Sequence, residues 1–188
     1  LEIEPDFAEA HSNLGNTLQE LGRLDEALAS YNRAIALKPD FAEAHSNLGN
    51  TLQELGRIDE ALASYNQAIA LNPDYAEAHF NLGNTLKKFG RLDEALASYT
   101  KAIALKPEDF KTHNQLLMCL FLQNKKADFF DELDYLINQD KVSSIIGSLA
   151  CRSALKYGIE KSNLFCTKPL NYVLHNDLKT HYDFEKIF

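Results

Sequence analysis

The chain has 188 residues, of which 45% are hydrophobic and 24% charged, and its formal net charge is −8. No apolar run reaches the roughly 18–20 residues that a membrane-spanning helix needs, and the acidic balance disfavours nucleic acid and anionic membrane surfaces as partners. Three cysteines without a CxxC pair argue against a disulfide framework, so we expect reduced thiols and a cytoplasmic location.

The sequence repeats with a period of 34 residues as far as Pro107. Four prolines recur at this spacing: Pro5, Pro39, Pro73 and Pro107. Residues 8–41 and 42–75 differ at only four positions, and residues 76–109 differ from 42–75 at ten. A fixed period of this length is typical of solenoid proteins, in which each repeat is one supersecondary unit stacked on the next.

Each unit contains two apolar stripes with a helical period. In the first unit the first stripe consists of Ala10, Leu14, Leu18 and Leu21. The second stripe consists of Leu24, Ala27, Leu28, Tyr31, Ala34 and Ile35. This spacing predicts two amphipathic helices per unit, joined as an antiparallel hairpin.

Short polar and glycine signals mark the helix ends. An aspartate followed three residues later by a glutamate resembles a capping box at the start of the first helix, at Asp6/Glu9, Asp40/Glu43 and Asp74/Glu77. One set of glycines suits the position just past this helix: Gly22, Gly56 and Gly90. A second set lies inside the helix, where glycine costs about 1 kcal/mol relative to alanine. We therefore expect the second helix to approach closely at Gly15, Gly49 and Gly83.

The combined pattern resembles the tetratricopeptide repeat (TPR), with its aromatic-x2-Leu-Gly-x2-Tyr, Ala-x3-aromatic and terminal proline positions. The first unit supplies these positions as His11, Leu14, Gly15, Leu18, Ala27, Tyr31 and Pro39. Histidine replaces the usual tryptophan and leucine the usual tyrosine, both at packing positions. The resemblance implies an all-α fold, a right-handed superhelical α-solenoid of antiparallel helix hairpins. Its three regular repeats are expected at residues 6–39, 40–73 and 74–107.

The amino-acid sequence of the repeats most resembles that of the TPR arm of O-GlcNAc-transferase-type proteins. Residues 1–5 match the end of a repeat, so we expect them to be the remnant of a truncated preceding repeat in a larger protein. Residues 108–138 are predicted to form a degenerate fourth hairpin, in which Leu117 replaces the internal glycine and Phe129 the small alanine.

The remainder of the chain departs further from the repeat. Residues 139–160 are predicted to form a capping helix, because terminal units of a solenoid have one side without a neighbouring repeat. Residues 161–188 are rich in aromatic side chains and are expected to be a C-terminal segment or a linker to a further domain. Part of this segment, FCTKPLNYVLHNDL, resembles linkers between TPR arrays and 2-oxoglutarate/iron oxygenase domains.

No metal, cofactor or catalytic site is predicted. Histidines recur one hairpin apart, at His11, His45, His79 and His113. Metal ligands must lie within about 2 Å of one ion, so this ladder is predicted to pack at the repeat junctions. His175, Asp177 and His181 have the residue types of a non-haem iron triad. We nevertheless expect them to be surface or linker residues, because no strand-rich domain surrounds them.

A polar stripe runs beside the apolar stripe on each first helix. In TPR superhelices the first helices line a concave groove, so the resemblance places these stripes there. Asparagine carries a donor and an acceptor on a short stem, and a ladder of asparagines can bond the backbone of an extended peptide. The predicted peptide-binding residues are Asn13, Asn16, Asn47, Asn50, Asn81, Asn84, Glu9, Glu43 and Glu77.

Several functions remain open at this point. The carboxylate clamp that binds chaperone C-termini needs basic residues at the positions of Ser12, Glu77 and Asn81, and none of these residues is basic. Because the predicted groove is acidic, an extended neutral or basic segment is the expected partner. The main hypothesis is a protein-interaction module without enzymatic activity. The alternatives are a structural spacer or a scaffold that self-associates through its repeat ends, and the substrate-recruiting arm of a parent glycosyltransferase or 2-oxoglutarate oxygenase.

Overall fold

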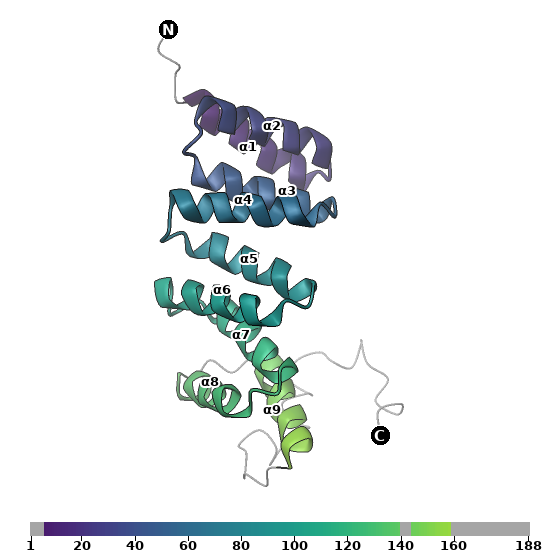
Figure 1. The fold of residues 1–188 in the computed structure, drawn as a ribbon, viewed down its shortest axis with the longest axis vertical. Coiled ribbons are helices and arrows are strands. Elements are labelled where there is room, and N and C mark those ends of the chain that lie inside the picture. Colours follow the sequence, from purple (N-terminus) through teal and green to yellow (C-terminus); the bar gives the residue numbers. More distant parts are fainter. Residues whose placement is uncertain (1–5, 140–143, 159–188) are drawn as a thin grey trace. The chain divides into compact units, whose positions relative to one another are not determined.

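The computed structural model describes residues 6–139 and 144–158, and α-helix is the only regular secondary structure there. In chain order the helices are α1 (Asp6–Glu20), α2 (Leu24–Leu37), α3 (Ala42–Glu54), α4 (Ile58–Leu71), α5 (Ala76–Lys88), α6 (Leu92–Leu105), α7 (Phe110–Leu122), α8 (Lys126–Asn138) and α9 (Ser144–Tyr157) (Figure 1). None of these helices has the length and apolarity of a membrane span. The chain divides into two compact units, Leu1–Thr112 and His113–Phe188.

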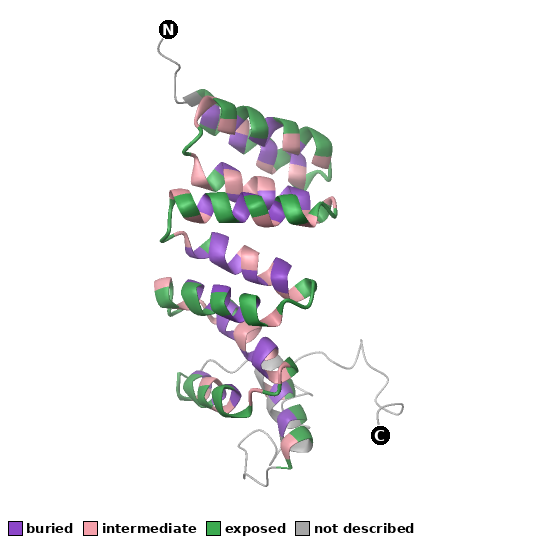
Figure 2. Ribbon diagram, viewed as in Figure 1, coloured by how far each residue is buried: buried purple, intermediate pink, exposed green. Residues whose placement is uncertain are grey.

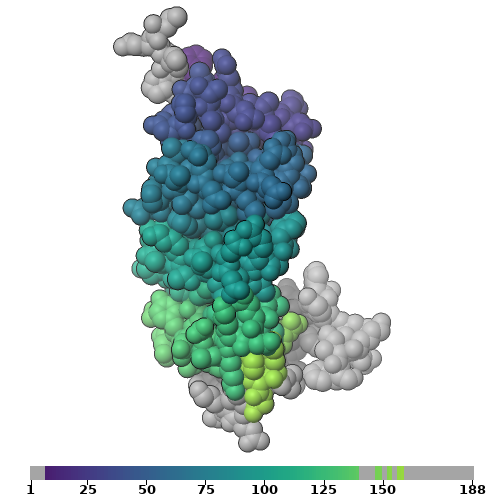
Figure 3. Space-filling model, viewed as in Figure 1, coloured from purple at the N-terminus to yellow at the C-terminus, as the bar shows by residue number. Residues whose placement is uncertain are grey.

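The first unit is built from three helix hairpins, α1 with α2, α3 with α4, and α5 with α6. Helix α2 also packs on α3 and α4 on α5, and α1, α3 and α5 contact one another in succession. Figure 3 shows the hairpins as bands stacked against one another. The predicted all-α solenoid of antiparallel hairpins is therefore confirmed.

The turn inside each hairpin uses a glycine, as predicted. Gly22 has a φ of +71°, in the left-handed region that favours glycine. The N–H of Arg23 donates to the carbonyl of Leu18 at 2.8 Å and that of Gly22 to Gln19 at 2.9 Å, the bonding pattern of a Schellman motif. The same geometry recurs 34 residues later at Gly56, whose φ is +76°.

The capping boxes predicted at Asp40 and Asp74 are wrong. Helix α3 begins at Ala42 with Phe41 at its N-cap, and no side chain caps its first turn. Asp40 instead belongs to the preceding turn, where its carbonyl accepts the N–H of Ala42 at 3.0 Å. Helix α5 starts in the same way behind Tyr75.

A tyrosine from the second helix fills the centre of each hairpin. Tyr31, Tyr65 and Tyr99 are completely buried, and Figure 2 shows the buried positions of the helices in purple. A Cβ atom added at Gly49 would lie 2.6 Å from Cε1 of Tyr65 and one at Gly15 equally close to Tyr31, nearer than carbon atoms can approach. The close approach predicted at the internal glycines is confirmed, and burial of the tyrosine ring explains why glycine is used inside a helix.

The junctions between hairpins combine leucine and histidine contacts. Leu48 packs against the cores of both the first and the second hairpin. The Nε2 atoms of His45 and His79 lie 3.1 Å from the carbonyls of Pro39 and Pro73. These histidines therefore tie the first helix to the turn before it, and the described residues contain no group of metal-ligating side chains.

The second unit contains the altered fourth hairpin, in which three packing positions change together. Leu117 and Leu133 stand where the regular repeats have the internal glycine and its tyrosine, and both are buried. Phe129 replaces the small alanine and is also completely buried. Its ring lies 5.3 Å from that of Phe130 and 6.4 Å from that of Tyr157 in α9. Large side chains thus fill the space that a tyrosine fills in the regular hairpins.

Helix α9 lies within the range predicted for a capping helix and packs on α8. Three predictions fall outside the described residues. These are the repeat remnant at 1–5, the aromatic-rich segment at 161–188, and the surface or linker role of His175, Asp177 and His181.

Candidate functional site

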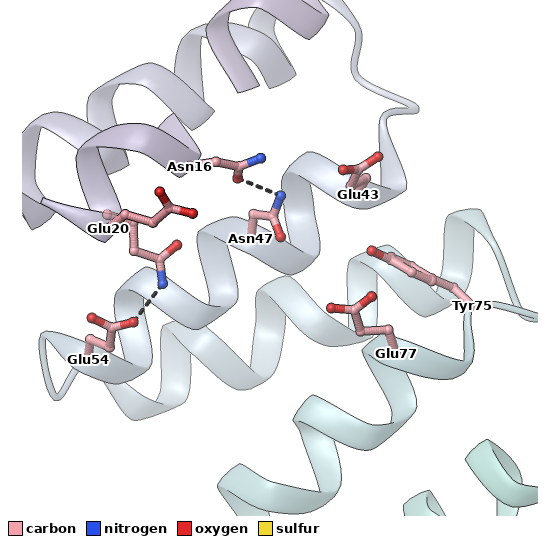
Figure 4. A pocket seen from close by; sticks show the side chains of 8 residues that line it. Asn16, Glu20, Glu43, Asn47, Glu54, Tyr75 and Glu77 are labelled. Carbon is pink, nitrogen blue, oxygen red and sulfur yellow. Dashed lines mark hydrogen bonds between the residues drawn. The ribbon is translucent and has the colours of Figure 1, made fainter. Parts of the chain in front are cut away.

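A hollow of about 470 Å³ opens on the face formed by the first helices (Figure 4). It is lined by α1, α3, α5 and the turn before α5, through Asn16, Gln19, Glu20, Glu43, Asn47, Glu54, Tyr75 and Glu77. Equivalent positions of successive repeats meet here because α1, α3 and α5 pack side by side.

The lining includes four of the predicted binding residues, Asn16, Glu43, Asn47 and Glu77. The other five do not line it: Glu9, Asn13, Asn50, Asn81 and Asn84. Glu9, Asn13, Glu43 and Glu77 are exposed, whereas the remaining asparagines are half-buried.

The asparagines fall into two rows with different surroundings. In the inner row, the hydroxyl of Tyr31 donates to Oδ1 of Asn16 at 2.7 Å. The same bond joins Tyr65 to Asn50 and Tyr99 to Asn84, at 2.8 Å in both cases. These bonds hold the inner asparagines by their carbonyl oxygens. In Figure 4 the oxygen of the Asn16 side chain points toward Asn47, and its nitrogen points away from Asn47.

The outer row consists of Asn13, Asn47 and Asn81. Asn47 donates from Nδ2 to Oδ1 of Asn16 at 3.0 Å, so the two rows meet across the boundary between the first two repeats. Its own Oδ1 points away from Asn16 (Figure 4). The two amides therefore present both a donor and an acceptor at one place on the surface.

The predicted binding residues did not include the other four residues of the lining, Gln19, Glu20, Glu54 and Tyr75. Gln19 donates to Oε1 of Glu54 at 2.6 Å and so joins α1 to α3. In the next repeat Gln53 accepts the hydroxyl of Thr85 at 3.0 Å and so joins α3 to α5. The signal was present, because Gln19 stands three residues after Asn16 and shares its face of the helix.

The hollow is strongly acidic. Glu20, Glu43, Glu54 and Glu77 line it, and none of them forms an ion pair with the residues that the structure describes. Burial raises the pKa of Tyr75 to about 12, with a further contribution from the charges of Glu77 and Glu43.

Tyr31, behind the hollow, shows the same effect. Burial raises its pKa to about 12, and the charges of Glu54, Glu20 and Glu43 add to the shift. Burial is the larger cause of this shift, and the neighbouring carboxylates add to it. The four carboxylates of the lining make the hollow negative.

Family models match the repeat region of the chain. A model described as "TPR repeat" matches residues 15–56 and 49–90, and one described as "Tetratricopeptide repeat" matches residues 76–109. A search of curated proteins found no match.

Several solved structures are similar to the chain. The first TPR of Spaghetti (RPAP3) bound to the HSP90 peptide SRMEEVD is 25% identical with a TM-score of 0.59, over 62% of this chain and 92% of that one. YrrB, a TPR protein with an unusual peptide-binding site, is 23% identical with a TM-score of 0.74, over 91% of this chain and 89% of that one. At this identity the similarity establishes a shared fold and nothing more.

A mutant of the Thermobaculum terrenum O-GlcNAc transferase is 28% identical with a TM-score of 0.58. The match covers 62% of this chain but only 22% of the transferase. The predicted similarity to the repeats of such transferases is therefore confirmed for the helical array alone.

Proposed function

Because the chain belongs to the tetratricopeptide repeat family, we propose that it is a protein-interaction module that binds an extended peptide segment along α1, α3 and α5. The observation that carries the proposal is the hollow on this face, where amide and carboxylate side chains of successive repeats converge. No catalytic role is proposed for the chain.

The spacing of the helices fits an extended ligand. Packed helices lie about 8–10 Å apart, and an extended chain advances about 3.3 Å per residue. A peptide that crosses the first helices would therefore meet a new repeat about every third residue. At each crossing an outer asparagine can bond a peptide N–H or C=O without reading the side chain.

The RPAP3 structure supports this use of the fold, since that protein is bound to an HSP90 peptide. The chemistry of the ligand should differ here. The hollow of this chain is acidic, and the positions of Ser12, Glu77 and Asn81 lack the basic residues of a carboxylate clamp. We therefore propose a neutral or basic segment as the partner.

The proposal predicts that replacing Asn13, Asn47 and Asn81 together by alanine weakens peptide binding by about 1–3 kcal/mol in sum, the worth of a few net hydrogen bonds. Binding would be measured on an array of neutral and basic peptides, with circular dichroism to check that helicity is kept. The matched control replaces Asn32 and Asn66, which are exposed on α2 and α4, and should bind as the parent does. If the triple variant binds every peptide as well as the parent, the asparagine ladder is not the binding element.

A second candidate is self-association, favoured by the exposed apolar side chains of α1. Leu14 is 48% exposed, although its equivalent Leu48 packs between two hairpin cores. Phe7 on the same helix and Leu21 directly after it are also exposed. If this face associates, sedimentation velocity should show oligomers that grow with concentration, and Leu14→Gln should reduce them. A monomer at all concentrations would remove this candidate.

A further inference from the structure

We propose that the face formed by α1, α3 and α5 selects a segment whose charges run in a fixed order along the C-terminal ends of these helices, with basic side chains over the first two repeats and an acidic side chain over the third. This inference rests on the proposed peptide-binding function. It adds the charge pattern that a partner must carry.

The acidic part of this order is the hollow itself. Glu20 and Glu54 lie at one end of the hollow and Glu43, Tyr75 and Glu77 at the other, with Asn16 and Asn47 between them (Figure 4). A hollow of about 470 Å³ has room for the long aliphatic stem of a lysine or arginine. Because the hollow has glutamates at both ends, the cationic head group would lie near a carboxylate at either end.

The order reverses at the third repeat. The last turns of α1 and α3 present Gln19–Glu20 and Gln53–Glu54, whereas the same positions of α5 hold Lys87 and Lys88. The row along the C-terminal ends of the first helices therefore reads Glu20, Glu54, Lys88, and Lys88 is exposed. The row along the N-terminal ends does not reverse, since it reads Glu9, Glu43, Glu77.

The reversal of charge predicts how many residues separate the basic and the acidic side chains of the peptide. One repeat corresponds to about three residues of an extended chain. An acidic residue that faces Lys88 would thus lie about three residues from the basic residue that faces Glu54. A uniformly basic segment would meet repulsion at Lys87 and Lys88, and a uniformly acidic one would be repelled by the hollow.

The test compares peptides of identical composition in fluorescence anisotropy. One set has basic residues grouped at one end and acidic residues at the other, in both chain directions, and the other set alternates them. The better grouped peptide is expected to bind about tenfold more tightly than the alternating ones, because several half-exposed ion pairs each contribute little. The preference should shrink at high salt.

A charge-reversed variant, Lys87→Glu with Lys88→Glu, should lose the preference for grouped charges and bind uniformly basic peptides best. Lysines in the last turn also favour the helix dipole, so helicity of the variant would be checked. The matched control is Lys101→Glu with Lys106→Glu, an equal charge change at exposed positions of the third hairpin outside the first helices. It should keep the preference of the parent.

The outcomes separate the two proposals. Equal binding of grouped and alternating peptides, or an unchanged preference in the Lys87 and Lys88 variant, would overturn the charge order and leave peptide binding intact. Failure of every peptide to bind, whatever its charge pattern, would overturn the proposed function and the charge order together.

Discussion

Replacing Tyr65 by alanine is expected to remove about 3–5 kcal/mol from the free energy of unfolding of the repeat array. The ring is completely buried in the middle of the second hairpin, against Gly49. Its loss would leave a cavity that the backbone of α3 cannot fill, because glycine has no side chain to move into it. Urea denaturation followed by circular dichroism would measure the change.

The control for this prediction is Tyr65→Phe, which keeps the ring and removes only the hydroxyl that donates to Asn50 at 2.8 Å and lies 3.2 Å from Oε1 of Gln53. It should cost about 1 kcal/mol, the usual net value of one hydrogen bond. Equal losses in the two variants would mean that the hydrogen bond, and not the packing of the ring, stabilises the hairpin.

Replacing Phe129 by alanine should destabilise the second unit by a similar amount, about 3–5 kcal/mol. The ring is completely buried and contacts the rings of Phe121, Phe130 and Tyr157. Hydrogen exchange of the α8 amides would report the local loss, because stability in a repeat protein is not uniform along the chain.

Phe130→Ala provides the comparison, since Phe130 is adjacent in sequence but only partly buried. Its replacement should cost clearly less than that of Phe129. Similar acceleration of exchange in both variants would show that aromatic content, and not burial at the former alanine position, stabilises this hairpin.

The helix pairs could be predicted from sequence because the period repeats. Each apolar stripe recurs 34 residues later, so a single reading of residues 8–41 also describes 42–75 and most of 76–109. The helix starts were less predictable. Asp40 had the spacing of a capping residue, but the turn after Pro39 takes it out of the helix, and Phe41 occupies the N-cap.

The residues of the proposed binding face could be predicted only in part from the sequence pattern. The polar stripe placed Asn16 and Asn47 on one side of their helices, and both line the hollow. The pattern could not show that Tyr31, 15 residues along the chain, returns to bond Asn16. Contacts between hairpins, such as Gln19 with Glu54, depend on how the repeats stack and have no signal within one repeat.

The glycine–tyrosine contact also limits how one repeat can diverge from its neighbours. The two residues lie 16 positions apart, and a side chain at the glycine position would collide with the tyrosine ring. The fourth hairpin has leucine at both positions, Leu117 and Leu133, with both buried. A repeat can therefore acquire a side chain at the glycine position only if the tyrosine is replaced as well, and homologous repeats should show the two positions co-varying in this sense.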